Sequence, residues 1–150
     1  MKKKILLGAA ALIAAGVVLW LVLYLPMTME LSACLGKDHA AGAKACPKLL
    51  ARSQYSGKDA ARVFALLKYA GHLMPLGRRG EAPPVLQEAR QIAGLEGVFS
   101  IENERTAAMN QTTLMLWAFH MLEGRRDLAM QAMSDGKRRS SAKTLQVQRP

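Results

Sequence analysis

The stretch that decides the architecture is 5–25, which reads ILLGAAALIAAGVVLWLVLYL and contains no charged residue. At a rise of about 1.5 Å per residue, a helix of this length spans about 31 Å, the thickness of the hydrocarbon core of a bilayer. Trp20 and Tyr24 lie near its far end, where amphipathic rings favour the membrane interface. The stretch therefore predicts a single transmembrane helix.

Three lysines in front of this helix predict its orientation. Lys2, Lys3 and Lys4 form a basic segment over residues 1–4, and positive residues next to a span resist translocation. We expect this segment to stay in the cytoplasm and the chain after Pro26 to emerge on the other side. In a bacterial cell, this orientation predicts a single-pass inner-membrane protein with a periplasmic C-terminal domain.

A cleaved signal peptide and a lipid anchor are the two alternatives to an uncleaved signal anchor. A cleaved signal has a shorter apolar region, of about 7–15 residues, that ends in small residues, whereas this one is longer and lacks an Ala-x-Ala site. The tetrapeptide Leu31-Ser32-Ala33-Cys34 resembles a bacterial lipobox, whose cysteine becomes lipidated. Residues 26–30, which include a charge, separate it from the apolar stretch. The anchor is favoured, and lipidation of Cys34 stays open as an alternative.

Cys34 and Cys46 are the only cysteines of the chain. In an oxidising periplasm they are candidates for one disulfide, and closing so short a loop stabilises a fold by roughly 2–3 kcal/mol in the chain-entropy model. Two free thiols are the alternative, since the spacing is neither a redox Cys-x-x-Cys nor a zinc-binding pattern. A lipid on Cys34 and the disulfide exclude each other.

Residues 38–133 predict a small all-α domain. Apolar residues recur at three- and four-residue spacing, and no strand-like alternation of useful length is present. Capping residues, prolines and glycines delimit five expected helices. The first is capped by Asp38 and runs from about His39 to Arg52 with Pro47 inside it, and the second is capped at Ser56. The third starts at Pro83 and Pro84 and ends at Gly94, the fourth is capped at Ser100, and a short last helix covers 127–133. Residues 26–37 are expected to form a stalk.

The net charge of +10 lies mainly at the two ends of the chain. After Gly136 the sequence reads Lys137-Arg138-Arg139-Ser140-Ser141, so residues 134–150 are expected to form a basic disordered tail. A nucleic-acid-binding domain would instead gather its charge on one face among aromatic residues. We therefore expect no nucleic-acid partner, and a basic surface suited to anionic lipid or acidic protein.

A glycine turn recurs three times, each time before an Ala-rich helix, which suggests a stack of helix–turn–helix units. The turns are Leu35-Gly36-Lys37-Asp38, Leu76-Gly77-Arg78-Arg79 and Glu123-Gly124-Arg125-Arg126. The sequence resembles tetratricopeptide-repeat proteins, best over residues 63–93. The matching positions are Tyr69, Ala70 and Leu73 in a first helix, Gly77 at the turn, and Ala82, Leu86 and Ala89 in a second helix.

The resemblance has departures. Leu66 stands where a Trp is usual, and the glycine turns are 41 and 47 residues apart, longer than the usual spacing of about 34. The first unit has almost no first helix. Residues 34–50 are also similar to the opening of disulfide-bearing periplasmic repeat proteins. The resemblance implies a helical-hairpin domain that binds protein or peptide, and a generic helical bundle is the alternative.

Catalytic and metal-binding patterns are missing from the sequence. His39, His72 and His120 are scattered over three expected helices, and no His-x-x-x-His, Gly-x-Ser-x-Gly or phosphate-cradling glycine loop is present. We expect a non-enzymatic protein without cofactor or metal.

Two functions remain as hypotheses. In the first, the outer domain is an adaptor or assembly module for an envelope complex, with Arg62, Tyr69, His72 and Trp117 guessed from helical position to contact the partner. In the second, the chain is a small accessory subunit whose anchor makes the functional contact. The small residues of that helix, including Gly8 and Gly16, would allow close packing there.

Overall fold

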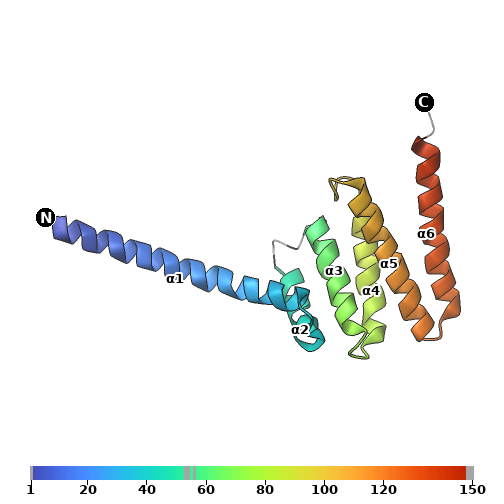
Figure 1. Ribbon diagram of the computed structural model, residues 1–150, viewed down its shortest axis with the longest axis horizontal. Helices are drawn as coiled ribbons and strands as arrows, with labels where there is room; N and C mark the ends of the chain where they lie inside the picture. The colour runs from blue at the N-terminus through green and yellow to red at the C-terminus, as the bar shows by residue number, and fades with distance from the viewer. Residues whose placement is uncertain (1, 53–54, 56, 148–150) are drawn as a thin grey trace.

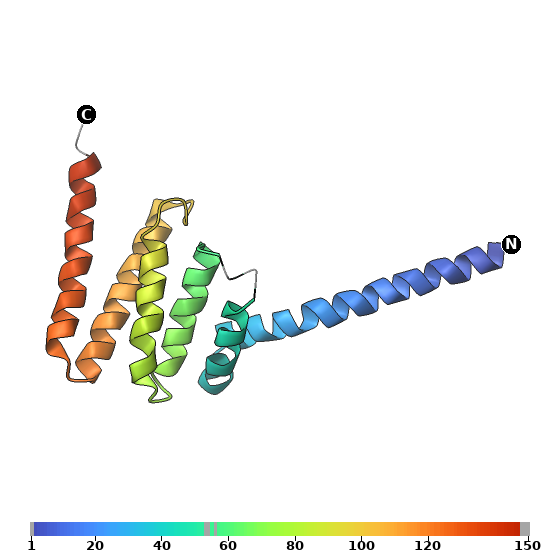
Figure 2. The ribbon, with the colours of Figure 1, turned by 180° about the vertical axis from the view of Figure 1, so that it is seen from behind.

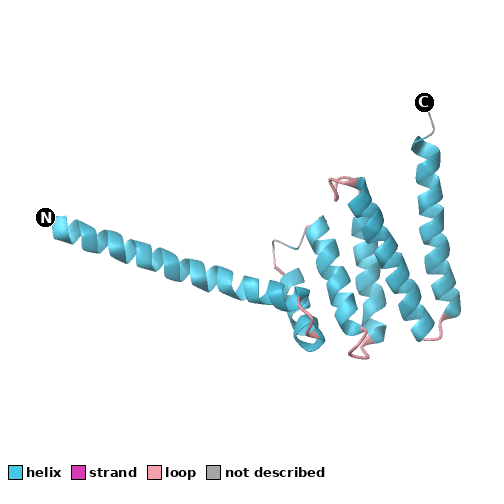
Figure 3. Cartoon of the chain, viewed as in Figure 1, coloured by secondary structure: helices cyan, strands magenta, loops and turns pink. Residues whose placement is uncertain are grey.

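The chain is helical along nearly its whole length (Figure 3). The computed structural model describes residues 2–52, 55 and 57–147, and the side chains of 13–22, 24–52, 55 and 57–138. The elements are α1 (Lys2–Leu35), α2 (His39–Leu50), α3 (Ala60–Leu73), the short 3₁₀ helix η2 (Arg79–Glu81), α4 (Ala82–Ala93), α5 (Glu102–Leu122) and α6 (Arg126–Val147). No strand occurs in these described ranges, so the predicted all-α class is confirmed.

The body of the protein is a stack of helical hairpins in two layers. Each helix packs against the next one along the chain, and α3 also contacts α1 and α5. The end of α1, α3 and α5 therefore form one layer, and α2, α4 and α6 form the other. Figures 1 and 2 show α3 to α6 standing side by side, with α1 running out sideways and α6 farthest from the N-terminus.

Local sequence explains most of the helix boundaries. Asp38 caps α2 as predicted, because its carboxylate accepts hydrogen bonds from two backbone N–H groups of the first turn. Asp59 caps α3 by accepting from the N–H of Arg62, whereas Ser56, the expected cap, lies outside the described residues. Gly77 and Gly124 both have φ near +70°, the left-handed region in which glycine is favoured, and they turn the chain between α3 and α4 and between α5 and α6.

The start of α5 differs from the prediction that Ser100 caps it. The helix begins at Glu102, and Ile101 occupies the cap position without a side-chain hydrogen bond. Glu102 and Glu104 lie in the first turn, where their negative charge interacts favourably with the helix dipole.

Helix α1 continues through the segment that was expected to be a stalk. Pro26 lies inside the helix, and Thr28 donates a hydrogen bond from its hydroxyl to the carbonyl of Leu25 at 2.9 Å. A proline costs one backbone hydrogen bond, but the turns that follow it are held by packing, since Cys34 is completely buried. The last turns of α1 therefore supply the first helix that the first repeat unit was expected to lack.

The exposed part of α1 is long and apolar enough to cross a membrane, judged by length and composition. Among the described residues this candidate span covers Ile13–Leu35, and it overlaps the predicted span over 5–25. The rings of Trp20 and Tyr24 stack at 5.5 Å between centroids, next to Pro26. The side chains of Lys2, Lys3 and Lys4 lie outside the described ones.

Two apolar clusters hold the stack together. The main one joins α3, α4 and α5 around Leu73, Leu86 and the fully buried Phe119. The smaller one gathers Cys34, Cys46, Leu49 and Ala65 at the junction of α1, α2 and α3. Leu50 and Tyr69 pack against both clusters, so the end of α1 is part of the same packed unit as the hairpins.

The C-terminal end also differs from the expected disordered tail after residue 134. Helix α6 runs on to Val147 instead of ending near Met133. Gly136 does not stop the helix, because its backbone lies directly against α5: a β-carbon there would stand 2.8 Å from Thr113 Cγ2. Its role is close packing between two helices.

Candidate partner-binding groove

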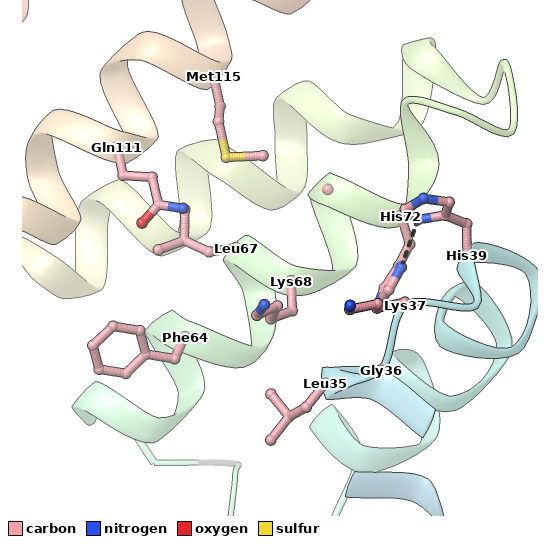
Figure 4. Close-up of a pocket in the computed structure, with 11 residues that line it drawn as sticks. Leu35, Gly36, Lys37, His39, Phe64, Leu67, Lys68, His72, Gln111 and Met115 are labelled. Atoms are coloured by element: carbon pink, nitrogen blue, oxygen red, sulfur yellow. Dashed lines mark hydrogen bonds between the residues drawn. The ribbon is translucent and has the colours of Figure 1, made fainter. Parts of the chain in front are cut away.

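A groove with a volume of about 690 Å³ opens on the layer formed by the end of α1, α3 and α5 (Figure 4). This volume falls in the usual range for binding pockets. Eleven residues line it: Leu35, Gly36, Lys37, His39, Phe64, Leu67, Lys68, Gly71, His72, Gln111 and Met115. We call it the α1–α3–α5 groove.

The floor of the α1–α3–α5 groove is apolar. Leu67 is nearly buried there, while Leu35 and Phe64 keep 49% and 46% of their surface exposed. The Phe64 ring meets Phe99 edge-on at 6.0 Å between centroids, which holds it in place. Gly71 leaves the wall open, since a β-carbon at this position would meet no atom within 4 Å. Exposed apolar area of this kind is what a binding surface offers.

The charge along the α1–α3–α5 groove has one sign. Lys37 and Lys68 are exposed, His39 stands beside them, and none of the described residues that line the groove is acidic. A positive rim over an apolar floor favours a ligand that combines apolar groups with carboxylates.

One end of the groove is built around His72, which is only 4% exposed. Its Nε2 lies 2.7 Å from the carbonyl oxygen of Cys34, so Nε2–H donates to that oxygen. Its Nδ1 lies 3.2 Å from Nδ1 of His39, as the dashed line in Figure 4 shows. The ring presses against Gly42, where a β-carbon would stand 2.3 Å from Nε2. The His72 side chain thus connects α3 to the end of α1, and its ring leaves room only for a glycine at position 42 of α2.

Two further links attach α1 to the domain. The predicted disulfide between Cys34 and Cys46 is present, with a Cα–Cα distance of 4.8 Å. This disulfide and a thioether lipid on the sulfur of Cys34 exclude each other. Arg52 donates a hydrogen bond to Glu30 at 2.7 Å. The α1 wall of the groove is therefore firmly connected to α2 and α3.

The four guessed partner-binding residues do not converge in the structure. Arg62 donates to Glu88 at 2.6 Å and to the carbonyls of Leu50 and Tyr55, so it holds the connection between α2 and α3. Tyr69 is half-buried between the two clusters. Of the four, only His72 lines the α1–α3–α5 groove.

Trp117 is 37% exposed and lies two residues beyond Met115, on the opposite side of α5 from the groove. Arg62 borders a second, smaller hollow of about 360 Å³ at the other end of α3. Leu35, Lys37, Phe64, Lys68 and Met115 are among the lining residues that were not predicted from the sequence. Their one local signal is a lysine and a glycine, Lys68 and Gly71, which follow the apolar run 63–67 of α3.

In the described part of the chain, no three His, Cys, Asp or Glu side chains come together in a way that would hold a metal ion. No protein-family model, curated protein or solved structure matches this chain. The geometry and charge of the α1–α3–α5 groove are therefore the features that indicate what this chain can bind.

Proposed function

We propose that this chain is a non-enzymatic adaptor, held in a membrane by α1, that binds a segment of a protein partner in the α1–α3–α5 groove. The observation that carries the proposal is the open apolar floor under a rim of positive charge. A stack of hairpins supports a tetratricopeptide-like interpretation, in which one layer of helices presents a binding surface.

The proposed location is the inner membrane of a bacterium, with the domain in the periplasm. Lys2, Lys3 and Lys4 favour an N-terminus that stays in the cytoplasm. The disulfide between Cys34 and Cys46 supports an oxidising compartment for the domain.

The same geometry favours a partner that is itself near the membrane. Because α1 continues without a break from the apolar segment into the wall of the groove, the groove is held close to the bilayer surface. The expected ligand is a segment of an envelope complex that carries apolar side chains and carboxylates.

The test is affinity purification of the full-length tagged protein from detergent-solubilised membranes at physiological salt. Two groove variants are compared with wild type: Lys68→Glu reverses the charge of the rim, and Gly71→Leu fills open space. Lys44→Glu is the matched control, since Lys44 is an exposed lysine on α2 in the other layer. We expect wild type and Lys44→Glu to recover the same amount of partner. Either groove variant should recover about 10-fold less, as for a residue at the centre of an interface. Equal recovery with all variants, or no partner with wild type, contradicts the proposal.

The rival function, in which the anchor itself makes the contact, is separated by a second experiment. Gly16 is exposed on α1 with no atom within 4 Å of a β-carbon placed there, so this face of the helix is open to a neighbour. Replacement of 5–25 by an unrelated apolar helix should leave partner recovery unchanged if the groove binds, and should abolish it if the anchor binds.

A further inference from the structure

The two complete hairpins, α3–α4 and α5–α6, share one register. Gly77 and Gly124, the left-handed glycines of their turns, are 47 residues apart. The same offset pairs Ala82 with Ala129, and both of these alanines are completely buried. The offset therefore matches equivalent positions of the two hairpins.

Equivalent positions differ in exposure. Leu67, Ala70 and Leu86 are 4%, 0% and 0% exposed, because they belong to the main core, to which α5 contributes Leu116 and Phe119. Their counterparts on the last hairpin are uncovered: Leu114 is 55% exposed, Trp117 37% and Met133 41%. Two further pairs follow the same pattern, half-buried Met74 with 40% exposed Met121, and buried Pro83 with 66% exposed Met130.

The residues at the uncovered positions of the last hairpin are apolar. The outer face of a terminal unit in a helical stack is ordinarily polar, since nothing packs on it. Here Leu, Trp and three Met residues form what we call the end face: Leu114, Trp117, Met121, Met130 and Met133. This surface has the composition of an interface at which a further helix packs.

The charge of α6 indicates which kind of partner the end face binds. Helix α6 has five basic residues, Arg126, Lys137, Arg138, Arg139 and Lys143, against Asp127 and Asp135. In the preceding hairpin, Arg90 occupies the position equivalent to Lys137, and its guanidinium approaches Asp135 of the covering α6 at 3.9 Å. A basic position therefore meets an acidic residue on the helix that covers it.

Other occupants fit less well. A second copy would bring two basic α6 helices together, and like charges repel across such a contact. The membrane that holds α1 is at the other end of the molecule, because α6 is the helix farthest from the N-terminus (Figures 1 and 2).

We propose that the end face binds an amphipathic helix of a protein partner, with an apolar stripe flanked by acidic residues, in the place that a further hairpin would occupy. This surface is separate from the α1–α3–α5 groove, because none of the residues of the end face lines the groove, so the protein carries two docking surfaces. An adaptor of this form joins one partner near the membrane to another farther from it.

The chain has two tryptophans, so Trp20→Phe leaves Trp117 as the sole tryptophan, placed within the end face, and its emission is excited selectively at a wavelength that tyrosine does not absorb. The full-length protein in detergent micelles is titrated with a synthetic tryptophan-free amphipathic peptide of three heptads, with Leu in the stripe and Glu on both flanks. A matched peptide carries Lys in place of Glu. We expect a saturable blue shift of Trp117 emission with the Glu peptide, and binding that is weaker by about 10-fold or more with the Lys peptide.

Variants then test whether the Glu peptide binds at the end face. Met130→Glu combined with Met133→Glu should weaken binding of the Glu peptide by about 10-fold or more, and both positions are exposed, so the fold is retained. The control is Leu95→Glu combined with Ile101→Glu, two exposed apolar residues beside the α4–α5 connection. Lys68→Glu should leave this binding unchanged, which separates it from binding in the groove.

Five results overturn the proposal. Three concern the peptides and variants: an equal response to the Lys peptide, an equal loss with the control variant, and no shift with the Glu peptide. The fourth is a shift that follows protein concentration alone, which indicates a second copy. The fifth is a shift that appears with anionic lipid vesicles but not with peptide.

Discussion

Two helical glycines, Gly42 in α2 and Gly71 in α3, are expected to respond to alanine with opposite signs. In an isolated helix, alanine is favoured over glycine by about 1 kcal/mol at either position. The β-carbon of Gly71→Ala would meet no atom within 4 Å, so the whole preference is available. We expect Gly71→Ala to stabilise the domain by about 0.5–1 kcal/mol.

Gly42→Ala places its β-carbon 2.3, 2.4 and 2.6 Å from three ring atoms of His72. The buried ring cannot move away without losing the hydrogen bond from Nε2 to the Cys34 carbonyl. Overpacking costs about 1–3 kcal/mol, and the lost hydrogen bond about 0.5–1.5 kcal/mol. After the helix preference of about 1 kcal/mol is subtracted, a net destabilisation of about 0.5–3.5 kcal/mol remains.

Thermal unfolding of the full-length protein in detergent, followed by circular dichroism, measures both effects. For a domain of this size, 1 kcal/mol corresponds to about 4–8 °C in Tm, so the two variants should move the Tm in opposite directions. The double variant Gly42→Ala with His72→Ala removes the clash and should be more stable than the sum of the two single effects. A Gly42→Ala protein as stable as wild type, or strict additivity in the double variant, would contradict a clash between position 42 and the His72 ring.

Three other predictions concern stability. Reduction of the Cys34–Cys46 disulfide, or Cys46→Ser, should lower the free energy of unfolding by about 2–3 kcal/mol, and intact mass of the membrane-extracted protein with and without reductant should show a two-dalton change without a lipid. Arg62→Met should cost about 1.5–3 kcal/mol in urea unfolding, because it leaves loop carbonyls without their charged donor, but should leave partner recovery unchanged. Burial, and to a smaller extent the charge of Arg125, lowers the pKa of His120 in the folded state. Below a pH of about 6.5 the unfolded chain therefore binds more protons than the folded chain does. Stability should be fully present above that pH and decline below it, and His120→Gln should flatten this dependence in unfolding measured from pH 7.5 to 5.

Local chemistry explains why part of the fold was predictable. Asp38 caps a helix by bonding the backbone two and three residues away, and Gly77 and Gly124 turn the chain because of their own φ angles. The disulfide between Cys34 and Cys46 was predicted from the short separation of the two cysteines, on the condition that they face an oxidising compartment. Each of these features depends on residues close together in the sequence, and each is present in the structure.

The groove and the roles of individual side chains were not predictable in the same way. Leu35 and Met115 line one hollow although they are far apart in the sequence, and only the packing of α1 and α5 on α3 brings them together. Arg62 was expected to contact a partner, but its guanidinium donates to Glu88 and to the carbonyls of Leu50 and Tyr55. A periodic pattern predicts which face of a helix is apolar, and it does not predict which neighbour each polar residue will meet.

By itself, the sequence determined that the chain is helical, that 5–25 can span a bilayer, and where the hairpins turn, because helix propensity, hydrophobic length and glycine conformation are properties of short segments. The tertiary structure alone decided that α1 passes through Pro26 to become part of the domain, that α6 continues past Gly136, and that Trp117 is exposed where Ala70 is buried. These outcomes depend on which helices cover which faces. A packed contact between distant segments can hold a helix through a proline or a glycine, and the lack of one leaves an apolar face open.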